Sequence, residues 1–199
     1  GMVNILAASA IRELDQAENV RIQVGGLPQE PVPPLNYQIV YSLEGVLDYY
    51  TTRSWVLRDG EPLQVDALTE IETAEFPEPV GRLEAFHTAG GLSVMPWTYK
   101  GQVRNMEYKT LRYPGHAEAM RVIRDLGLLG LDPVEVDGQK VSPRRLFIAV
   151  VEPQLKRPEG RDLVALRVEA EGLKNGQPKK IGYELLDFYD EANGISAME

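Results

Sequence analysis

Residues 164–171 read Val164-Ala165-Leu166-Arg167-Val168-Glu169-Ala170-Glu171, and this stretch decides the fold. Its apolar side chains alternate with charged ones, which is the period-two pattern of a strand with one buried face. Asn175-Gly176 follows, a dipeptide typical of two-residue turns between antiparallel strands, and residues 181–185 resume the alternation. The pattern predicts a terminal β-hairpin with one solvated face, so the sheet is at least partly antiparallel.

Helical and strand patterns alternate along the rest of the chain, with short gaps between them. The periodicity predicts helices over residues 3–17, 42–50, 94–99, 114–126 and 142–151. It predicts further strands over residues 20–24, 37–41, 53–57, 63–65, 70–76, 82–87 and 102–113. Gly25-Gly26 is expected to end the first strand, Pro153 to end the last helix, and a bulge is expected within 102–113. We therefore expect a single α/β (α+β) domain over residues 1–199, with a mixed, partly antiparallel sheet covered by helices mainly on one face.

Composition narrows the classes of function. The 199 residues carry a net charge of −9, which argues against a nucleic-acid partner or an anionic membrane surface. The apolar N-terminal stretch lacks a basic leader and is interrupted by Arg12 and Glu13, so it predicts neither a signal peptide nor a membrane span. No cysteine is present, which suits a cytoplasmic location, and two distant histidines give no reason to expect a metal site.

Nucleotide and hydrolase motifs are absent from the sequence. No G-x-G-x-x-G follows a strand, and there is no phosphate-binding G-x-x-x-x-G-K, H-E-x-x-H or G-x-S-x-G. The segment from Lys109 to His116 instead offers a strand running into the first turn of a helix, a place where anions bind to free backbone N–H groups. The simpler interpretation is that Pro114 starts a helix and Arg112 pairs with a surface carboxylate.

Six segments in the same order resemble the saccharopine dehydrogenase family, with lysine 6-dehydrogenase and saccharopine dehydrogenase-like enzymes as the nearest relatives. They are residues 1–4 (GMVN), 24–28 (VGGLP), 34–37 (PLNY), 41–45 (YSLEG), 83–86 (LEAF) and 110–116 (TLRYPGH). The resemblance implies a C-terminal substrate-binding and dimerisation domain, similar in fold to that of glyceraldehyde-3-phosphate dehydrogenase-like enzymes. It also implies that the N-terminal Rossmann domain, which binds NAD or NADP in the family, is missing from this chain and that both ends are cut.

The same resemblance implies an oxidative deamination, or its reverse, of a carboxylate-bearing amino acid. Arg112 is expected to clamp a substrate carboxylate through its planar fork, with Thr110 adding a contact from the same strand face. Tyr113 is expected to join them only if the chain bends at Pro114. His87 is a candidate proton-transfer residue, with a satisfied structural histidine as the alternative.

The sequence also suggests roles for two further residues, Asn4 and His116. Asn4 is expected near the nicotinamide, or else is an ordinary helix N-cap. His116 is expected to be structural, in the first turn of its helix.

Two functions from different classes follow. In the first, the chain is the substrate-binding and homodimerising part of an NAD(P)-dependent amino-acid dehydrogenase that is inactive alone. In the second, it is a free-standing, non-catalytic binding or assembly domain of the same fold.

Overall fold

A computed structural model describes residues 1–39, 42–157 and 160–198. Its helices are α1 (Met2–Glu13), α2 (Leu43–Thr51), α3 (Met95–Thr98), α4 (His116–Asp125) and α5 (Pro143–Leu155). Its strands are β1 (Gln16–Pro28), β2 (Ser54–Arg58), β3 (Glu61–Val65), β4 (Glu72–Glu75), β5 (Arg82–His87), β6 (Val103–Arg112), β7 (Val134–Val136), β8 (Gln139–Val141), β9 (Asp162–Lys174) and β10 (Gln177–Phe188). No helix in these described ranges is long and apolar enough to cross a membrane.

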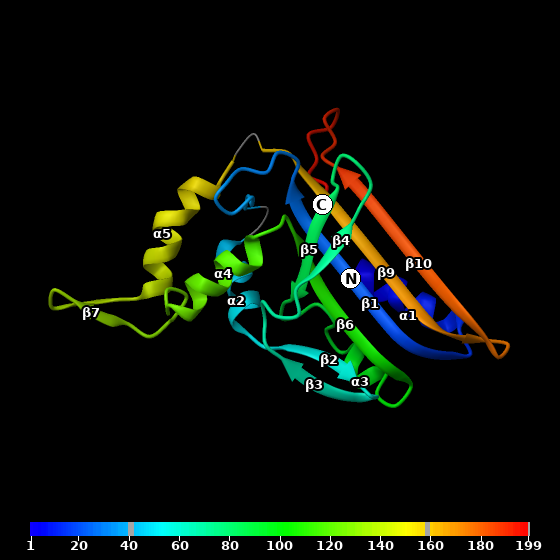
Figure 1. The fold of residues 1–199 in the computed structure, drawn as a ribbon. Helices are drawn as coiled ribbons and strands as arrows, with labels where there is room; N and C mark the ends of the chain where they lie inside the picture. Colours follow the sequence, from blue (N-terminus) through cyan, green and yellow to red (C-terminus); the bar gives the residue numbers. More distant parts are fainter. Residues whose placement is uncertain (40–41, 158–159, 199) are drawn as a thin grey trace.

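One mixed sheet organises the molecule. Its order is β10-β9-β1-β6-β2-β3, and β5 also pairs with β6 and carries β4 outside it (Figure 1). β1 and β6 run parallel, with Val24 beside Thr110, and the other pairings in this sheet are antiparallel. The predicted fold class, a mixed and partly antiparallel sheet with helices, is confirmed.

The terminal hairpin forms as the sequence predicts. Lys174 pairs with Gln177 next to the turn, and the register continues to Leu163 beside Phe188. Asn175 and Gly176 have φ angles of 51° and 72°, the left-handed pair that a two-residue turn between twisted strands requires.

The first helix and strand differ from the prediction. α1 ends at Glu13, and β1 continues through Gly25-Gly26 to Pro28. Pairing with β9 holds β1 extended over its whole length, and β6 pairs with its other edge from Ala17 to Val24. Gly25 is needed inside the strand, because a Cβ there would lie 2.4 Å from the Leu111 carbonyl oxygen.

Several smaller predictions were wrong. Residues 37–39 form no strand, while the other two residues of that predicted strand, 40 and 41, lie outside the described ranges. The bulge falls between β1 and β9 near Ala17, whereas β6 keeps a continuous register with β1. Pro153 does not stop α5, because Lys156 N still donates to the Glu152 carbonyl at 2.9 Å and closes the last turn.

Three apolar cores surround β6. One joins the sheet to α1 and α3, a second lies among α2, α4 and α5, and a third lies on the other side of the sheet under β4. Met106 belongs to the first and Leu111 to the third, while Thr110 is paired with Phe86 of the second. α2, α4 and α5 form a group to one side of the long strands (Figure 1). The C-terminal end of β6 therefore lies where the sheet meets these helices.

Candidate functional site

Arg112 and Thr110 lie at the C-terminal end of β6 and, two residues apart, share one face of the strand. The Arg112 side chain is almost fully buried; its Nη1 donates to the carbonyl oxygens of Leu111 at 2.8 Å and Gly26 at 3.4 Å. The guanidinium carbon lies 5.0 Å from the centroid of the Tyr37 ring. Thr110 Oγ1 is 2.7 Å from Thr88 Oγ1. The structure thus brings these two predicted residues together, inside a buried polar network.

His116 belongs to the same network. Its Nδ1 is 3.0 Å from the Leu35 carbonyl oxygen, and because a carbonyl only accepts, Nδ1 carries the proton. The unprotonated Nε2 then accepts from the Tyr50 hydroxyl at 3.0 Å. Burial, reinforced by the Arg112 charge, lowers the pKa of His116 to about 3. His116 is therefore a neutral residue that ties α2 and the segment before it to the start of α4.

The N-terminus of α4 is already occupied by a carboxylate. Glu84 lies opposite Arg112 on β5; its Oε1 accepts from Ala117 N at 2.6 Å and its Oε2 from Gly115 N at 3.0 Å. A carboxylate at this position is stabilised by the free backbone N–H groups and the helix dipole. The strand-to-helix junction that the sequence marked as an anion site is thus filled by the protein's own side chain.

Tyr113 is directed away from the Arg112 guanidinium. Its hydroxyl donates to the Pro28 carbonyl at 2.9 Å, and its ring packs against the core under β4. It fixes the end of β1 to the end of β6.

His87 faces the opposite side of the sheet from Arg112. It pairs with Lys109 across β5 and β6, and residues directly opposite in an antiparallel pair share a face. Its Nε2 is 3.1 Å from Glu70 Oε2, and its Nδ1 is 3.3 Å from the Tyr108 carbonyl oxygen. The structure does not bring His87 to the other predicted site residues.

The surroundings of His87 are a compact network of ion pairs. Ligand atoms of Glu70, His87 and Glu107 lie within 4.8 Å of one another, a spacing that a metal ion could use. Arg58 Nη2 already bridges the two carboxylates, at 3.0 Å from Glu70 and 2.8 Å from Glu107. Lys109 Nζ adds a bond of 2.8 Å to the Glu70 carbonyl. A protein cation therefore holds the position that a metal would take.

Asn4 lies in the first turn of α1, which packs on β1, β9 and β10. The helix N-cap is Gly1, so the capping alternative for Asn4 is wrong. Asn4 Oδ1 is buried and has no hydrogen-bond partner among the described residues.

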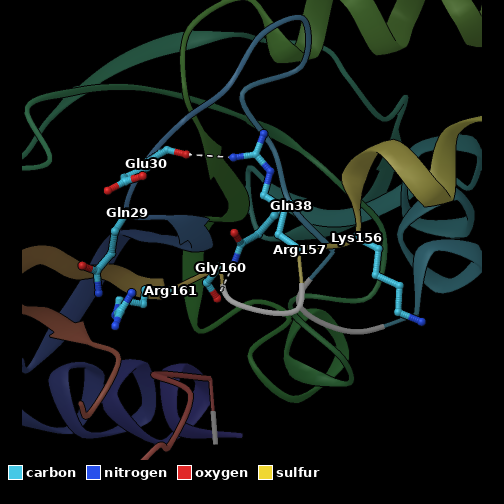
Figure 2. A pocket seen from close by; sticks show the side chains of 7 residues that line it. All are labelled: Gln29, Glu30, Gln38, Lys156, Arg157, Gly160 and Arg161. Atoms are coloured by element: carbon cyan, nitrogen blue, oxygen red, sulfur yellow. Dashed lines mark hydrogen bonds between the residues drawn. The ribbon is translucent and has the colours of Figure 1, made fainter.

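A pocket of about 510 Å³ opens between the segment after β1 and the segment that joins α5 to β9 (Figure 2). It is lined by Gln29, Glu30, Gln38, Lys156, Arg157, Gly160 and Arg161. Gln29 directly follows Pro28, the partner of Tyr113, and Gln38 directly follows Tyr37, the partner of Arg112. The contact residues of Arg112 and Tyr113 are thus sequence neighbours of two lining residues, but Thr110, Arg112 and Tyr113 do not themselves line the pocket.

The pocket is cationic in an acidic chain. Arg157 reaches the Glu30 carbonyl oxygen at 3.5 Å, Gln38 Nε2 donates to the Gly160 carbonyl at 3.3 Å, and both contacts are drawn in Figure 2. Arg161 forms an exposed ion pair with Glu191. Among the described lining residues, three side chains are cationic and one is acidic, and although Arg161 is paired with Glu191, this excess of positive charge suits carboxylates.

Comparison with known families identifies the chain. The model of the saccharopine dehydrogenase C-terminal domain matches residues 1–199. The chain belongs to this family. A likeness to the family's C-terminal domain was predicted from the six segments above, and the prediction is confirmed.

A solved relative shows the same fold. The domain is similar to apo histidine-tagged saccharopine dehydrogenase (L-Glu forming) from Saccharomyces cerevisiae, with a TM-score of 0.76 and 17% sequence identity. The match covers 99% of this chain and 59% of that chain. This chain thus spans about three-fifths of the length of that enzyme.

Sequence reasoning missed the pocket of this saccharopine dehydrogenase C-terminal domain. The available signal was the run from Lys156 to Arg161, which places three cations within six residues directly after a helix. The run could be assigned to a pocket only from the fold, which places it beside Gln29 and Gln38 from distant parts of the chain.

Proposed function

We propose that this domain is the substrate-binding and dimerisation part of a cytoplasmic NAD(P)-dependent dehydrogenase for a lysine- or saccharopine-like amino acid. The observation that carries the proposal is the cationic pocket that lies just after the end of β1 and just before the start of β9 in a saccharopine dehydrogenase C-terminal domain. In such a reaction, hydride passes between nicotinamide and the amine-bearing carbon, and water adds to or leaves the imine.

The residues of this chain do not fit a dinucleotide by themselves. The sequence has no G-x-G-x-x-G. The helix that follows β6 has its first N–H groups taken by Glu84, so it offers no place for a pyrophosphate. We therefore assign NAD or NADP to a Rossmann domain outside this chain and derive no step through it.

The proposed work of this chain is to bind and orient carboxylates. Lys156, Arg157 and Arg161 supply charge-assisted hydrogen bonds, and Gln29 and Gln38 supply neutral ones.

The network at the end of β6 holds the pocket walls. Arg112 keeps the Tyr37 ring in place next to Gln38, and Tyr113 holds Pro28 next to Gln29, whereas Thr110 holds Thr88 away from the lining residues. Arg112 is a positioning residue whose buried charge adds to the positive potential of the pocket. His87 and Asn4 have no contact with this pocket in the part of the chain that the structure describes, so their predicted roles do not enter the proposal.

Calorimetric titration of the chain with saccharopine and with lysine tests the proposal. We expect saccharopine, which carries more carboxylates, to bind more tightly. Arg157→Gln and Arg161→Gln should each weaken saccharopine binding about tenfold or more, because a charge-assisted hydrogen bond contributes about 1.5–3 kcal/mol.

Arg53→Gln is the matched control, since Arg53 forms an exposed ion pair with Asp66 away from the pocket. Equal saccharopine affinities of the native chain and the three variants would show that Arg157 and Arg161 do not bind its carboxylates. NADH fluorescence should not change on adding the chain, and tight NADH binding would contradict the assignment of the cofactor to another domain. A coding sequence for a Rossmann domain directly upstream would support the dehydrogenase, and a start codon at Met2 would support a free-standing binding domain.

A further inference from the structure

β10 is an outer strand of the sheet, and its outer edge pairs with no strand among the described residues. The strand is 12 residues long, and Leu185 and Phe188 are each 36% exposed. A long edge with apolar side chains is a template for pairing with another chain. Pro178 lies near its start and removes one backbone donor, but residues 179–188 contain no further proline.

The outward backbone groups belong to one set of residues. In a two-residue hairpin, the pair next to the turn, here Lys174 and Gln177, exchanges both backbone hydrogen bonds. The alternation that follows directs the N–H and C=O groups of odd-numbered residues of β10 towards β9. Residues 180, 182, 184 and 186 therefore present theirs to the open edge.

The odd-numbered side chains of β10 form a self-complementary series on the face that packs on α1. In order, they are Lys179, Ile181, Tyr183, Leu185 and Asp187, so a cation at one end matches an anion at the other, with apolar residues between.

The terminal charges of this series lack a charged neighbour across the hairpin. Lys179 lies opposite Gly172 and Asp187 opposite Val164, and within the described residues neither forms an ion pair. Lys180 on the other face differs, since it pairs with Glu169 at 2.8 Å and Glu171 at 3.3 Å.

We infer that β10 pairs antiparallel with β10 of a second copy of this chain, with a two-fold axis at Tyr183. This register places Lys179 opposite Asp187 of the second copy, and Ile181 opposite Leu185 of the second copy. It also makes residues 180, 182, 184 and 186 the hydrogen-bonded positions, which are the residues whose backbone groups point outward. Side chains at non-hydrogen-bonded positions approach most closely, so the charged and apolar matches fall where contact is greatest.

This pairing specifies the dimer within the proposed function, but it does not depend on the dehydrogenase chemistry. A continuous sheet across a two-fold axis is an isologous interface, in which each contact occurs twice. Reversing one charge therefore removes two attractive pairs and introduces two repulsive ones.

Sedimentation velocity over a concentration series tests the inference. We expect a dimer for the native chain, and a dimer dissociation constant raised about tenfold or more in Lys179→Glu and in Asp187→Lys. The double variant Lys179→Glu/Asp187→Lys should restore the dimer, because it exchanges the charges. Mixing the two single variants should also restore it, because both cross-pairs are then attractive.

Lys140→Glu on the separate β7–β8 hairpin is the control with the same change of charge. A native chain that stays monomeric at 100 µM would overturn the inference. So would a dimer that neither single variant weakens, since it would have to use another surface. Saccharopine binding is a separate measurement, so its failure would affect the proposed function and leave this interface standing.

Discussion

The two faces of β6 hold polar groups in different ways. On one face, Thr110 and Arg112 join hydroxyls, carbonyls and a neutral histidine. On the other, Glu107 and Lys109 lie in a network of opposite charges around His87. Both sets are buried, but only the first contacts a residue, Tyr37, that directly precedes a pocket-lining residue, Gln38. Closeness in sequence along one strand therefore does not place residues in one site, because neighbouring residues point to opposite sides.

Removing Lys109 should have the largest effect, since its side chain is 4% exposed and its Nζ lies 3.2 Å from Glu72 and 4.0 Å from Glu107. Lys109→Met removes the cation beside Glu72, while Glu107 keeps Arg58, so we expect the free energy of unfolding to fall by about 3 kcal/mol. Urea denaturation measures this loss. Saccharopine affinity of the folded fraction should stay unchanged, and a loss of affinity would mean that the two faces are coupled.

An exposed ion pair gives the control for that experiment. Lys100 pairs with Glu61 at 2.7 Å, but both side chains are more than half exposed. Lys100→Met should change stability little, because water screens such pairs.

The hydroxyl pair on the pocket side offers a smaller test. Thr110→Val leaves the Thr88 hydroxyl buried without its partner in the 2.7 Å bond, at a cost of about 1–3 kcal/mol, and Thr88→Val should cost less because the Thr110 hydroxyl also interacts with Tyr108. The double variant should cost much less than the sum of the single ones, since neither polar group then remains. Additive losses in a double-mutant cycle would show that each hydroxyl has another partner.

The pH dependence of stability should separate the neutral histidine from its charged surroundings. The folded-state pKa of His116 is about 3, below its ordinary value of 6.5, so the unfolded chain binds the extra proton between these values. Stability is therefore lost as the pH falls from 6.5 towards 3, by at most about 1.4 kcal/mol per pH unit from this one group.

His116→Gln keeps a donor for Leu35 and an acceptor for Tyr50 but cannot titrate. Its free energy of unfolding should depend less steeply on pH between 5 and 6.5 than that of the native chain. Parallel curves for the two proteins would mean that the pKa of His116 is the same in the folded and the unfolded chain.

The outer hairpin and the first strand show how far prediction from sequence reached. Residues 166–171 and 181–185 alternate, and Asn175-Gly176 lies between them, so local pattern and turn chemistry agree on one structure. β1 carries two glycines that usually interrupt strands, yet it is held extended by neighbours on both sides. The β7–β8 hairpin was missed although Asp137 and Gly138 form its turn with φ angles of 50° and 78°.

The sequence alone determined the fold class, the terminal hairpin, the helix capped by Ser42 and the family resemblance, because each depends on residue order over short spans. It also placed Thr110 and Arg112 on one strand face, since that follows from period two. Only the tertiary structure decided that His87 faces the other way, that Glu84 fills the start of α4, and that Lys156 and Arg157 meet Gln38. These outcomes depend on which distant segments pack together, and in a folded chain packing and strand pairing outweigh local preference.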